Sequence, residues 1–245
     1  MRNLVAALAC RNNSTRLYGK PLQLLDIKKN ISVIQHIINQ LKKKKIFKEI
    51  VLGISKEIDS EIYVQLAKKN NINYIFGDEF DVLSRLIQCG DKTFATDIFR
   101  ITTESPFPFL KNLKKKWKSH IKNNFDASFF DPGIDGCGYE IIKLEALKIS
   151  HRYGKKRHRS ELCSSYVREN INKFKINFLK VPNFLKNNNL RLTIDYPEDL
   201  IICRYFYNLI NNKKKNNFSS AINKIKKDKL IDSLLKNIKY KKKFI

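Results

Sequence analysis

Residues 4–21 read LVAALACRNNSTRLYGKP, an apolar run that ends in a polar loop. The run at 4–10 is typical of a buried strand in a parallel sheet. The loop after it carries the cations Arg11, Arg16 and Lys20 among small polar residues. Because α/β proteins bind phosphate groups where a first strand ends, we predict that this loop holds a triphosphate. A solvated basic turn is the alternative interpretation.

Strands and helices alternate along the chain that follows the loop. Short apolar runs predict strands, and apolar residues at helical spacing predict amphipathic helices. The strands are expected at 49–54, 73–76 and 97–102, and the helices at 31–41, 60–69 and 81–89. This alternation is typical of an α/β, Rossmann-like fold, in which a mostly parallel sheet has helices on both faces.

The alternation loosens after Pro106. The elements expected there are a basic helix at 111–123, strands at 125–130 and 141–144, helices at 145–151 and up to Arg168, an antiparallel strand at 174–181 and a last sheet strand at 190–195. Pro197, followed by two acids, starts a further helix. The segment after Asn211 is rich in Lys and Asn and holds a weak amphipathic helix at 221–238.

The composition is that of a globular protein. The chain has 245 residues, 42% of them hydrophobic, which suffices for one α/β domain with a full core. We find no signal peptide and no apolar stretch long enough to span a membrane, so we expect a soluble, cytoplasmic protein without a membrane partner. The five cysteines form no CxxC pair, and we expect free thiols and no cysteine metal site.

The formal net charge is +26. Lysines cluster at 42–45, 114–116, 213–215 and 241–243, and such a field attracts polyanions. No helix-turn-helix, zinc-finger, KH or RRM pattern is present, and aromatic residues are not interleaved with arginines. We therefore favour a solvated basic surface over a nucleic-acid site, because charge alone carries no sequence information.

The opening loop resembles a known signature. ALACRNNSTRLYGKPL is similar to the ARxxSTRLPGKxL pattern of the SpsF-like and CMP-sugar cytidylyltransferases, which include the CMP-acylneuraminate and CMP-Kdo synthetases. Residues 77–85 look like the family's GSEDDVLxR segment, and residues 190–200 look like its RLTxDTPEDL segment. The three motifs occur in the family's order over roughly residues 1–205, which leaves the Lys-rich tail outside the resemblance.

The chain also departs from the family pattern. Tyr18 replaces the usual Pro, and Asn12 and Asn13 replace a segment that often contains Gly. Residues 103–106 read TESP where these enzymes usually show Gly-Asp-x-Pro, so Glu104 stands in place of an Asp. A glutamate still offers a hard oxygen ligand, on a side chain that is one methylene longer.

The resemblance implies a fold of the nucleotide-diphospho-sugar transferase type and the transfer of CMP from CTP to an acidic sugar or sugar-like acceptor. Pyrophosphate would be released, and the product would serve surface polysaccharide or glycoconjugate synthesis. Arg11 and Lys20 would be the catalytic cations that hold the phosphates. The nucleotide-binding residues would be Ala9, Arg11, Asn12, Asn13, Ser14, Arg16, Lys20, Asp81 and Arg85. Asp81 could equally cap its helix, and we favour the cap.

Mg²⁺ is the expected cofactor. Glu104 and Asp195 each follow a predicted sheet strand at the same edge as the loop, and carboxylates together with phosphate oxygens suit this ion. For Asp195 the alternative is an acid that stabilises a helix N-terminus, a role that suits Glu198 and Asp199 better.

Acceptor recognition is expected from the middle of the chain, through Glu140, Arg157, Arg159 and Glu161, with Arg168 as a further candidate. Exposed salt bridges are the alternative for each of them. We assign residues 1–210 to a nucleotidyltransferase domain, 131–178 within it to a small acceptor-binding or dimerisation insert, and 211–245 to a helical tail. By analogy with the family, we expect a homodimer.

Two other functions stay open. One is a related nucleotidyltransferase that acts on a polyol phosphate or a phosphonate. The other is a non-catalytic polyanion-binding protein on the same fold.

Overall fold

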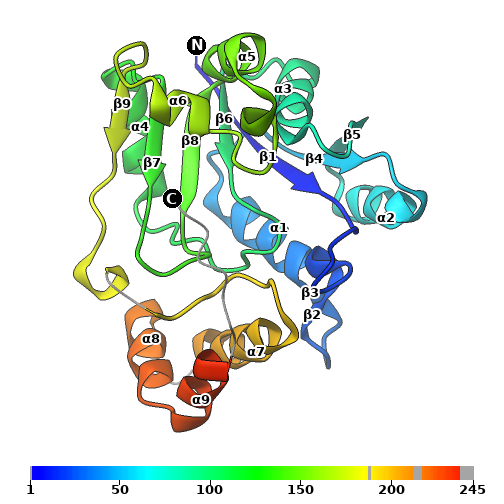
Figure 1. The fold of residues 1–245 in the computed structure, drawn as a ribbon, viewed down its shortest axis with the longest axis vertical. Coiled ribbons are helices and arrows are strands. Elements are labelled where there is room, and N and C mark those ends of the chain that lie inside the picture. The colour runs from blue at the N-terminus through cyan, green and yellow to red at the C-terminus, as the bar shows by residue number, and fades with distance from the viewer. Residues whose placement is uncertain (1, 187–188, 212–216, 238–245) are drawn as a thin grey trace.

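The computed structural model describes residues 2–186, 189–211 and 217–237. Within these ranges a seven-stranded sheet has the order β5-β4-β1-β6-β8-β7-β9 (Figure 1). Its strands are β1 Leu4–Cys10, β4 Glu49–Ser55, β5 Asn73–Gly77, β6 Asp97–Arg100, β7 Ala127–Phe130, β8 Tyr139–Lys143 and β9 Ile176–Phe178. β8 runs antiparallel to both neighbours, whereas the other neighbouring pairs are parallel. The predicted mostly parallel sheet is confirmed.

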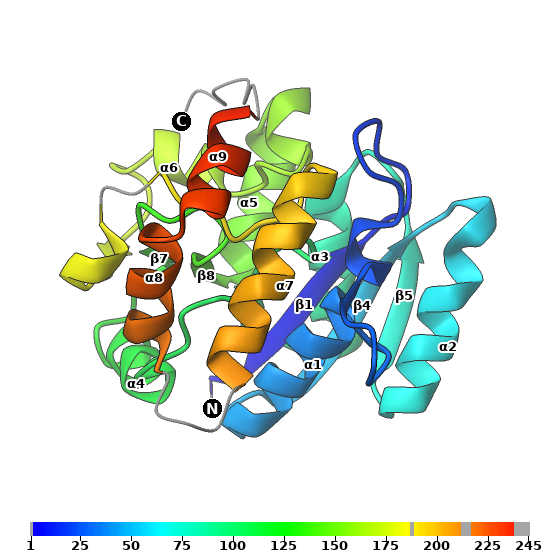
Figure 2. The same ribbon diagram turned by 90° about the horizontal axis from the view of Figure 1, so that it is seen from below.

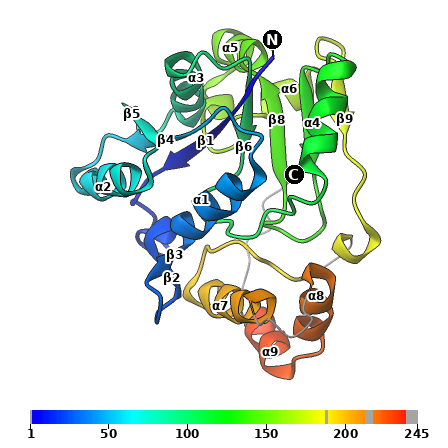
Figure 3. The same cartoon turned by 180° about the vertical axis from the view of Figure 1, so that it is seen from behind.

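Helices cover both faces of this sheet (Figures 1 and 3). One face is packed against α1 Val33–Lys44, α2 Glu61–Asn70, α4 Leu113–Lys122 and α7 Pro197–Asn211. The other is packed against α3 Val82–Lys92, α5 Leu144–Tyr153 and α6 Ser165–Glu169. Successive residues of β1 point to opposite faces, so Leu4, Ala6 and Leu8 join the first layer while Val5 and Ala7 join the second. The predicted α/β, Rossmann-like class is confirmed.

The first strand lies at the centre of the sheet, between β4 and β6. This position explains why its sequence is continuously apolar, since a central parallel strand is buried on both faces. The loop that follows β1 leads through the short hairpin of β2 Leu24–Asp26 and β3 Ile31–Ser32 into α1. The Ser32 side chain caps α1 by accepting a hydrogen bond from the Gln35 amide.

Two predicted strands differ from the structure. In the segment 174–181 only β9 is a strand, and it pairs with β7 in parallel, so the predicted antiparallel direction is wrong. Residues 190–195 form no strand of the main sheet, and Arg191 makes only an isolated bridge with Asp135. The alternating pattern there arises because an extended chain buries Leu190, Leu192 and Ile194 in the core.

The expected single helix at 221–238 consists of two helices, α8 Phe218–Lys226 and α9 Lys229–Asn237. The break has a local cause, because the Asp228 carboxylate accepts hydrogen bonds from the Leu230 and Ile231 amides and thereby caps α9. Both helices pack beside α7 (Figure 2) and bury Ile222 and Ile231 in the core. The rest of the predicted tail, 212–216 and 238–245, lies outside the described residues, and the domain boundary at 210 stays a prediction.

All five cysteines are buried free thiols, as expected. Burial raises the pKa of Cys89 to about 12 and that of Cys163 to about 11, so both stay protonated at neutral pH. Among the described residues, no helix is both long enough and apolar enough to cross a bilayer. The predicted dimerisation through residues 131–178 stays a prediction.

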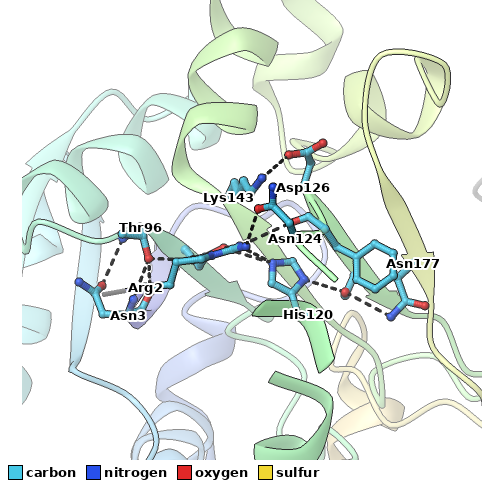
Figure 4. Close-up of polar contacts among 11 residues, drawn as sticks. Arg2, Asn3, Thr96, His120, Asn124, Asp126, Lys143 and Asn177 are labelled. Carbon is cyan, nitrogen blue, oxygen red and sulfur yellow. Dashed lines mark hydrogen bonds and ion pairs between the residues drawn. The ribbon is translucent and has the colours of Figure 1, made fainter. Parts of the chain in front are cut away.

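A buried polar cluster joins the amino-terminal ends of the central strands (Figure 4). Asp97, at the start of β6, accepts hydrogen bonds from Arg2 Nε at 2.9 Å and from Thr96 Oγ1 at 2.8 Å, and His120 Nε2 lies 3.2 Å from it. The other ring nitrogen of His120 lies 2.7 Å from Ser128 Oγ on β7. Burial alone would raise the pKa of Asp97, but the hydrogen bonds from His120, Arg2 and Thr96 outweigh it and lower the pKa.

This cluster predicts a pH-dependent loss of stability. Because the pKa of Asp97 is lower in the folded state, its contribution is present above the unfolded value of about 3.9 and is lost as the pH falls below it. Asp97→Asn should lower the free energy of unfolding by about 3–5 kcal/mol at pH 7 and flatten the acid limb of the stability profile. Urea denaturation between pH 3 and 7 measures both effects.

The matched control is Asp91→Asn, which removes an exposed ion pair with Lys148. It should cost less than about 1 kcal/mol. Equal losses of unfolding free energy for the two variants would show that the buried cluster stabilises the fold no more than an exposed ion pair does.

Candidate active site

A cleft of about 510 Å³ opens where β1 and β6 end. Its walls come from the first loop, from residues 100–104 after β6, and from Glu79, Arg85 and Glu161. The cleft therefore lies at the carboxyl edge of the sheet, where open α/β sheets bind their ligands. The predicted nucleotide-binding residues that line it are Ala9, Arg11, Asn12, Asn13, Ser14, Arg16, Lys20 and Arg85.

Asp81 is not part of this lining. Its carboxylate accepts a hydrogen bond from the Ser84 amide at 2.7 Å and so caps α3, and it also lies 2.8 Å from His151 Nε2. The capping role that we favoured from the sequence is confirmed.

The first loop is fastened to the segment after β4. Glu57 Oε2 accepts hydrogen bonds from the Asn12 amide at 3.1 Å and the Asn13 amide at 3.3 Å. Asn12 Nδ2 donates to the Asp59 carbonyl, and Tyr18 Oη donates to the Asp59 carboxylate. Asn12 and Tyr18, which differ from the family pattern, thus each hold the loop through a side-chain hydrogen bond to Asp59. The amides of Asn12 and Asn13 donate to Glu57, while the cationic side chains of the loop line the cleft.

Asp195 brings the cations of the loop together. Its carboxylate lies 2.7 Å from Lys20 Nζ and 2.8 Å from Arg16 Nη2, while its second oxygen lies 2.5 Å from Arg191 Nη2. Burial would raise the pKa of Asp195, but the hydrogen bond and charge of Lys20 and the charges of Arg16 and Arg191 lower it. Asp195 is therefore a carboxylate at neutral pH.

The helix that follows is capped by another acid. Asp199 Oδ2 accepts hydrogen bonds from the Asp195 amide at 2.9 Å and the Tyr196 amide at 3.0 Å, at the start of α7. The alternative that made Asp195 a helix-stabilising acid thus applies to Asp199, and the Asp195 side chain is directed to the cations of the loop instead.

Glu104 lies next to Asp195. The Glu104 carbonyl accepts a hydrogen bond from the Ile194 amide at 2.9 Å, and Glu104 lines the cleft. Burial raises the pKa of Glu104, and the charge of Lys20 opposes this rise. Among the described residues no group of three or more His, Cys, Asp or Glu could hold a metal. The Mg²⁺ site at Glu104 and Asp195 stays a prediction, in which the ion would keep several waters and take its other ligands from phosphates.

Arg85 is buried beneath the cleft. Its guanidinium donates to the carbonyls of Cys10 at 2.8 Å and Gly53 at 3.0 Å, the first at the end of β1 and the second in β4. A Cβ at Gly77 would meet Arg85 Cγ at 2.6 Å, so only glycine leaves room for this side chain. Arg85 therefore fixes the strand ends from which the loop departs.

The residues predicted to bind the acceptor do not lie together in the structure. Glu161 lines the cleft, 3.9 Å from Arg11, and Arg157 lines a second hollow beside it while pairing with Glu169. Arg159 lies 4.0 Å from Asp81 and donates to the His151 carbonyl. Glu140 is buried and paired with Arg100 and Arg168, outside the cleft lining.

Sequence reasoning missed Arg100, Glu57 and Arg191 as parts of the site. Arg100 interrupts an apolar run at the end of β6, which is the one local signal that pointed to it. Glu57 and Arg191 reach the site from separate segments, and no spacing in the sequence predicts that these segments meet there.

A family model described as cytidylyltransferase matches residues 5–237. The chain belongs to the cytidylyltransferase family. The match extends past residue 205, where the sequence motifs ended, and takes in α8 and α9. This corrects the expectation that the tail lies outside the resemblance.

Known members of this family and fold are similar to the chain. The spore coat polysaccharide biosynthesis protein SpsF of Bacillus subtilis is 23% identical over 201 residues, 81% of this chain and 84% of that protein. A cytidylyltransferase of Leptospira borgpetersenii superposes with a TM-score of 0.78 at 22% identity, over 97% of this chain and 98% of that one. A CMP:2-keto-3-deoxy-manno-octonic acid synthetase in complex with CTP superposes with a TM-score of 0.61 at 13% identity, over 82% and 97% of the two chains. The SpsF-like resemblance and the nucleotide-diphospho-sugar transferase type of fold are confirmed.

The carboxylate cluster predicts how metal and phosphate binding are linked. Asp195→Asn should tighten the binding of metal-free pyrophosphate about fivefold, because one negative charge close to the anion is worth about 1 kcal/mol in a wet cleft. The same variant should lose most of the gain in affinity that Mg²⁺ gives. Isothermal titration with pyrophosphate, in EDTA and in Mg²⁺, measures both quantities.

Asp135→Asn is the control, since it removes the same charge from an exposed side chain near Arg191. It should leave both affinities within about twofold. An Asp195→Asn variant with an unchanged Mg²⁺ titration would contradict the assignment of Asp195 as a ligand.

Proposed function

We propose that this chain transfers CMP from CTP to an acidic sugar or sugar-like acceptor, with release of pyrophosphate, in the synthesis of a surface polysaccharide or glycoconjugate. The observation that carries the proposal is the cleft lined by Arg11, Arg16, Lys20 and Glu104, in which Asp195 pairs with Arg16 and Lys20 from behind the lining. Its cations suit a triphosphate, and its carboxylates suit the metal that accompanies one.

The nucleotide and the pathway are supported by the relatives. The synthetase that shares the fold binds CTP, and the SpsF protein acts in spore coat polysaccharide biosynthesis, by their names. Among the described residues the cleft is the site with all three cations of the family motif. A CTP whose phosphates lie along the first loop would therefore use the groups that the motif provides.

The reaction joins an acceptor oxygen to the α-phosphorus of CTP and breaks the bond from that phosphorus to the β-phosphate bridging oxygen. Arg11 and Lys20 hold the β- and γ-phosphates and neutralise the charge that builds up on the leaving pyrophosphate. Arg16 reaches the same phosphates from the other end of the loop. Positioning and charge neutralisation of this kind account for most of the catalysis in phosphoryl-type transfer.

Glu104 and Asp195 would hold Mg²⁺ in this scheme, and the ion would supply positive charge that offsets the charge of the phosphates. Asp195 has a second task in the free protein. Its contacts with Lys20 and Arg16 keep those cations in place before the nucleotide arrives. Glu161 faces Arg11 across the cleft and is the acid best placed to bind the acceptor's hydroxyl or amino groups.

A turnover screen tests the proposal. The protein with CTP and Mg²⁺ should release pyrophosphate in the presence of nonulosonic acids or Kdo, and Arg11→Ala should reduce the rate by about 100-fold or more. The melting temperature of this variant should stay within about 2 °C, because Arg11 is half exposed and, in the described part of the chain, its ion-pair contact with Glu161 is 3.9 Å long.

Arg152→Ala is the matched control, an exposed arginine at the end of α5 outside the cleft lining, and it should keep the wild-type rate. Turnover with polyol phosphates or phosphonates alone would move the assignment to the related nucleotidyltransferases. An absence of turnover together with a strongly salt-dependent affinity for DNA or RNA would replace the enzyme by a polyanion-binding protein.

A further inference from the structure

One wall of the cleft is a short segment that we call the wall segment, residues 160–164. It carries Glu161, which lines both the cleft and the neighbouring hollow. Leu162 beside it is 58% exposed, whereas the next residue, Cys163, is buried in the core. Ser160 Oγ donates a hydrogen bond to the Arg157 carbonyl and accepts one from the Leu162 amide. Besides the burial of Cys163, side chains of the sheet contact the wall segment at Glu161 and at Ser164.

Arg100 supplies the first of these contacts. It stands at the end of β6, directly opposite Glu140 of β8 in the antiparallel register. One terminal nitrogen donates to the Glu161 carbonyl at 2.5 Å, and the other donates to Glu140 Oε2 at 2.9 Å. Although Arg100 lines the cleft, both of its terminal nitrogens already have protein partners.

Glu140 supplies the second contact. Its Oε1 accepts a hydrogen bond from Ser164 Oγ at 2.6 Å and another from Arg168 Nη2 at 3.1 Å. The carboxylate thus holds one end of the wall segment directly, through Ser164, and the other end through Arg100. The charges of Arg100 and Arg168 lower the pKa of Glu140 against the effect of burial, so the group is ionised at neutral pH.

We propose that Glu140 and Arg100 are positioning residues, which fix the wall segment so that Glu161 faces Arg11 on the acceptor side of the cleft. An arginine is needed because its planar group can donate to a carboxylate and to a carbonyl at once, which a lysine cannot do in the same geometry. The functional part of this inference rests on the proposed function. The structural part does not.

Hydrogen–deuterium exchange followed by mass spectrometry tests the structural part on the full chain. In Glu140→Gln the amides of residues 160–165 should exchange about tenfold faster or more, while peptides of β1 and β4 keep their wild-type protection. Lys143→Gln is the matched control, because Lys143 lies on β8 with Glu140 and the substitution breaks a 2.7 Å ion pair with Asp126. It should leave the wall segment unchanged.

A comparison of CTP affinity with the KM for the acceptor tests the functional part. In Glu140→Gln the affinity for CTP with Mg²⁺, from isothermal titration, should stay within about twofold, whereas the KM for the acceptor should rise about tenfold or more. Arg100→Lys should loosen the wall segment in the same way, and it serves as the second variant if Glu140→Gln does not fold.

Unchanged exchange at 160–165 in both variants would overturn the proposal. A CTP affinity that falls by much more than twofold would also overturn it, because the pair would then belong to the phosphate site. If no acceptor turns over in the wild type, the proposed function fails, while the exchange experiment still decides whether Glu140 positions the wall.

Discussion

The carboxylate of Asp195 is the contact on which the site depends. It gathers Lys20 and Arg16 from the first loop and Arg191 from its own segment. Three cations so close together would repel one another, and a buried carboxylate offsets that repulsion. The same segment leads into α7, whose start is capped by Asp199, so the loop, the cleft and the helical layer are joined at one point.

Local signals in the sequence predicted most of the fold. The continuous apolar run of β1 and the alternation up to β6 led to a parallel sheet, because burial on both faces demands such runs. Residues 190–195 misled the prediction, since an extended chain that packs against a core alternates in the same way as a strand. The direction of β9 was also wrong, because its partner β7 lies far away in the sequence.

The candidate site was partly predictable for a similar reason. The cations of the loop belong to one contiguous motif, and the structure finds them in one cleft. Glu57 and Arg100 act through contacts that cross the sheet, and only the folded chain brings them to the loop and to the wall segment. The net charge of +26 was no guide, because burial rather than charge distinguishes the cation of the site: both Lys20 and Lys29 are paired with an acid, but the side chain of Lys20 is 11% exposed and that of Lys29 is 68% exposed.

The central claim is that this cleft is a CTP site. Isothermal titration with CTP, ATP, GTP and UTP, each in Mg²⁺, tests it most directly, because it requires no knowledge of the acceptor. The account predicts one CTP per chain, bound about tenfold or more tightly than the other three nucleotides. Binding of none of them, or equal binding of all four, would contradict it.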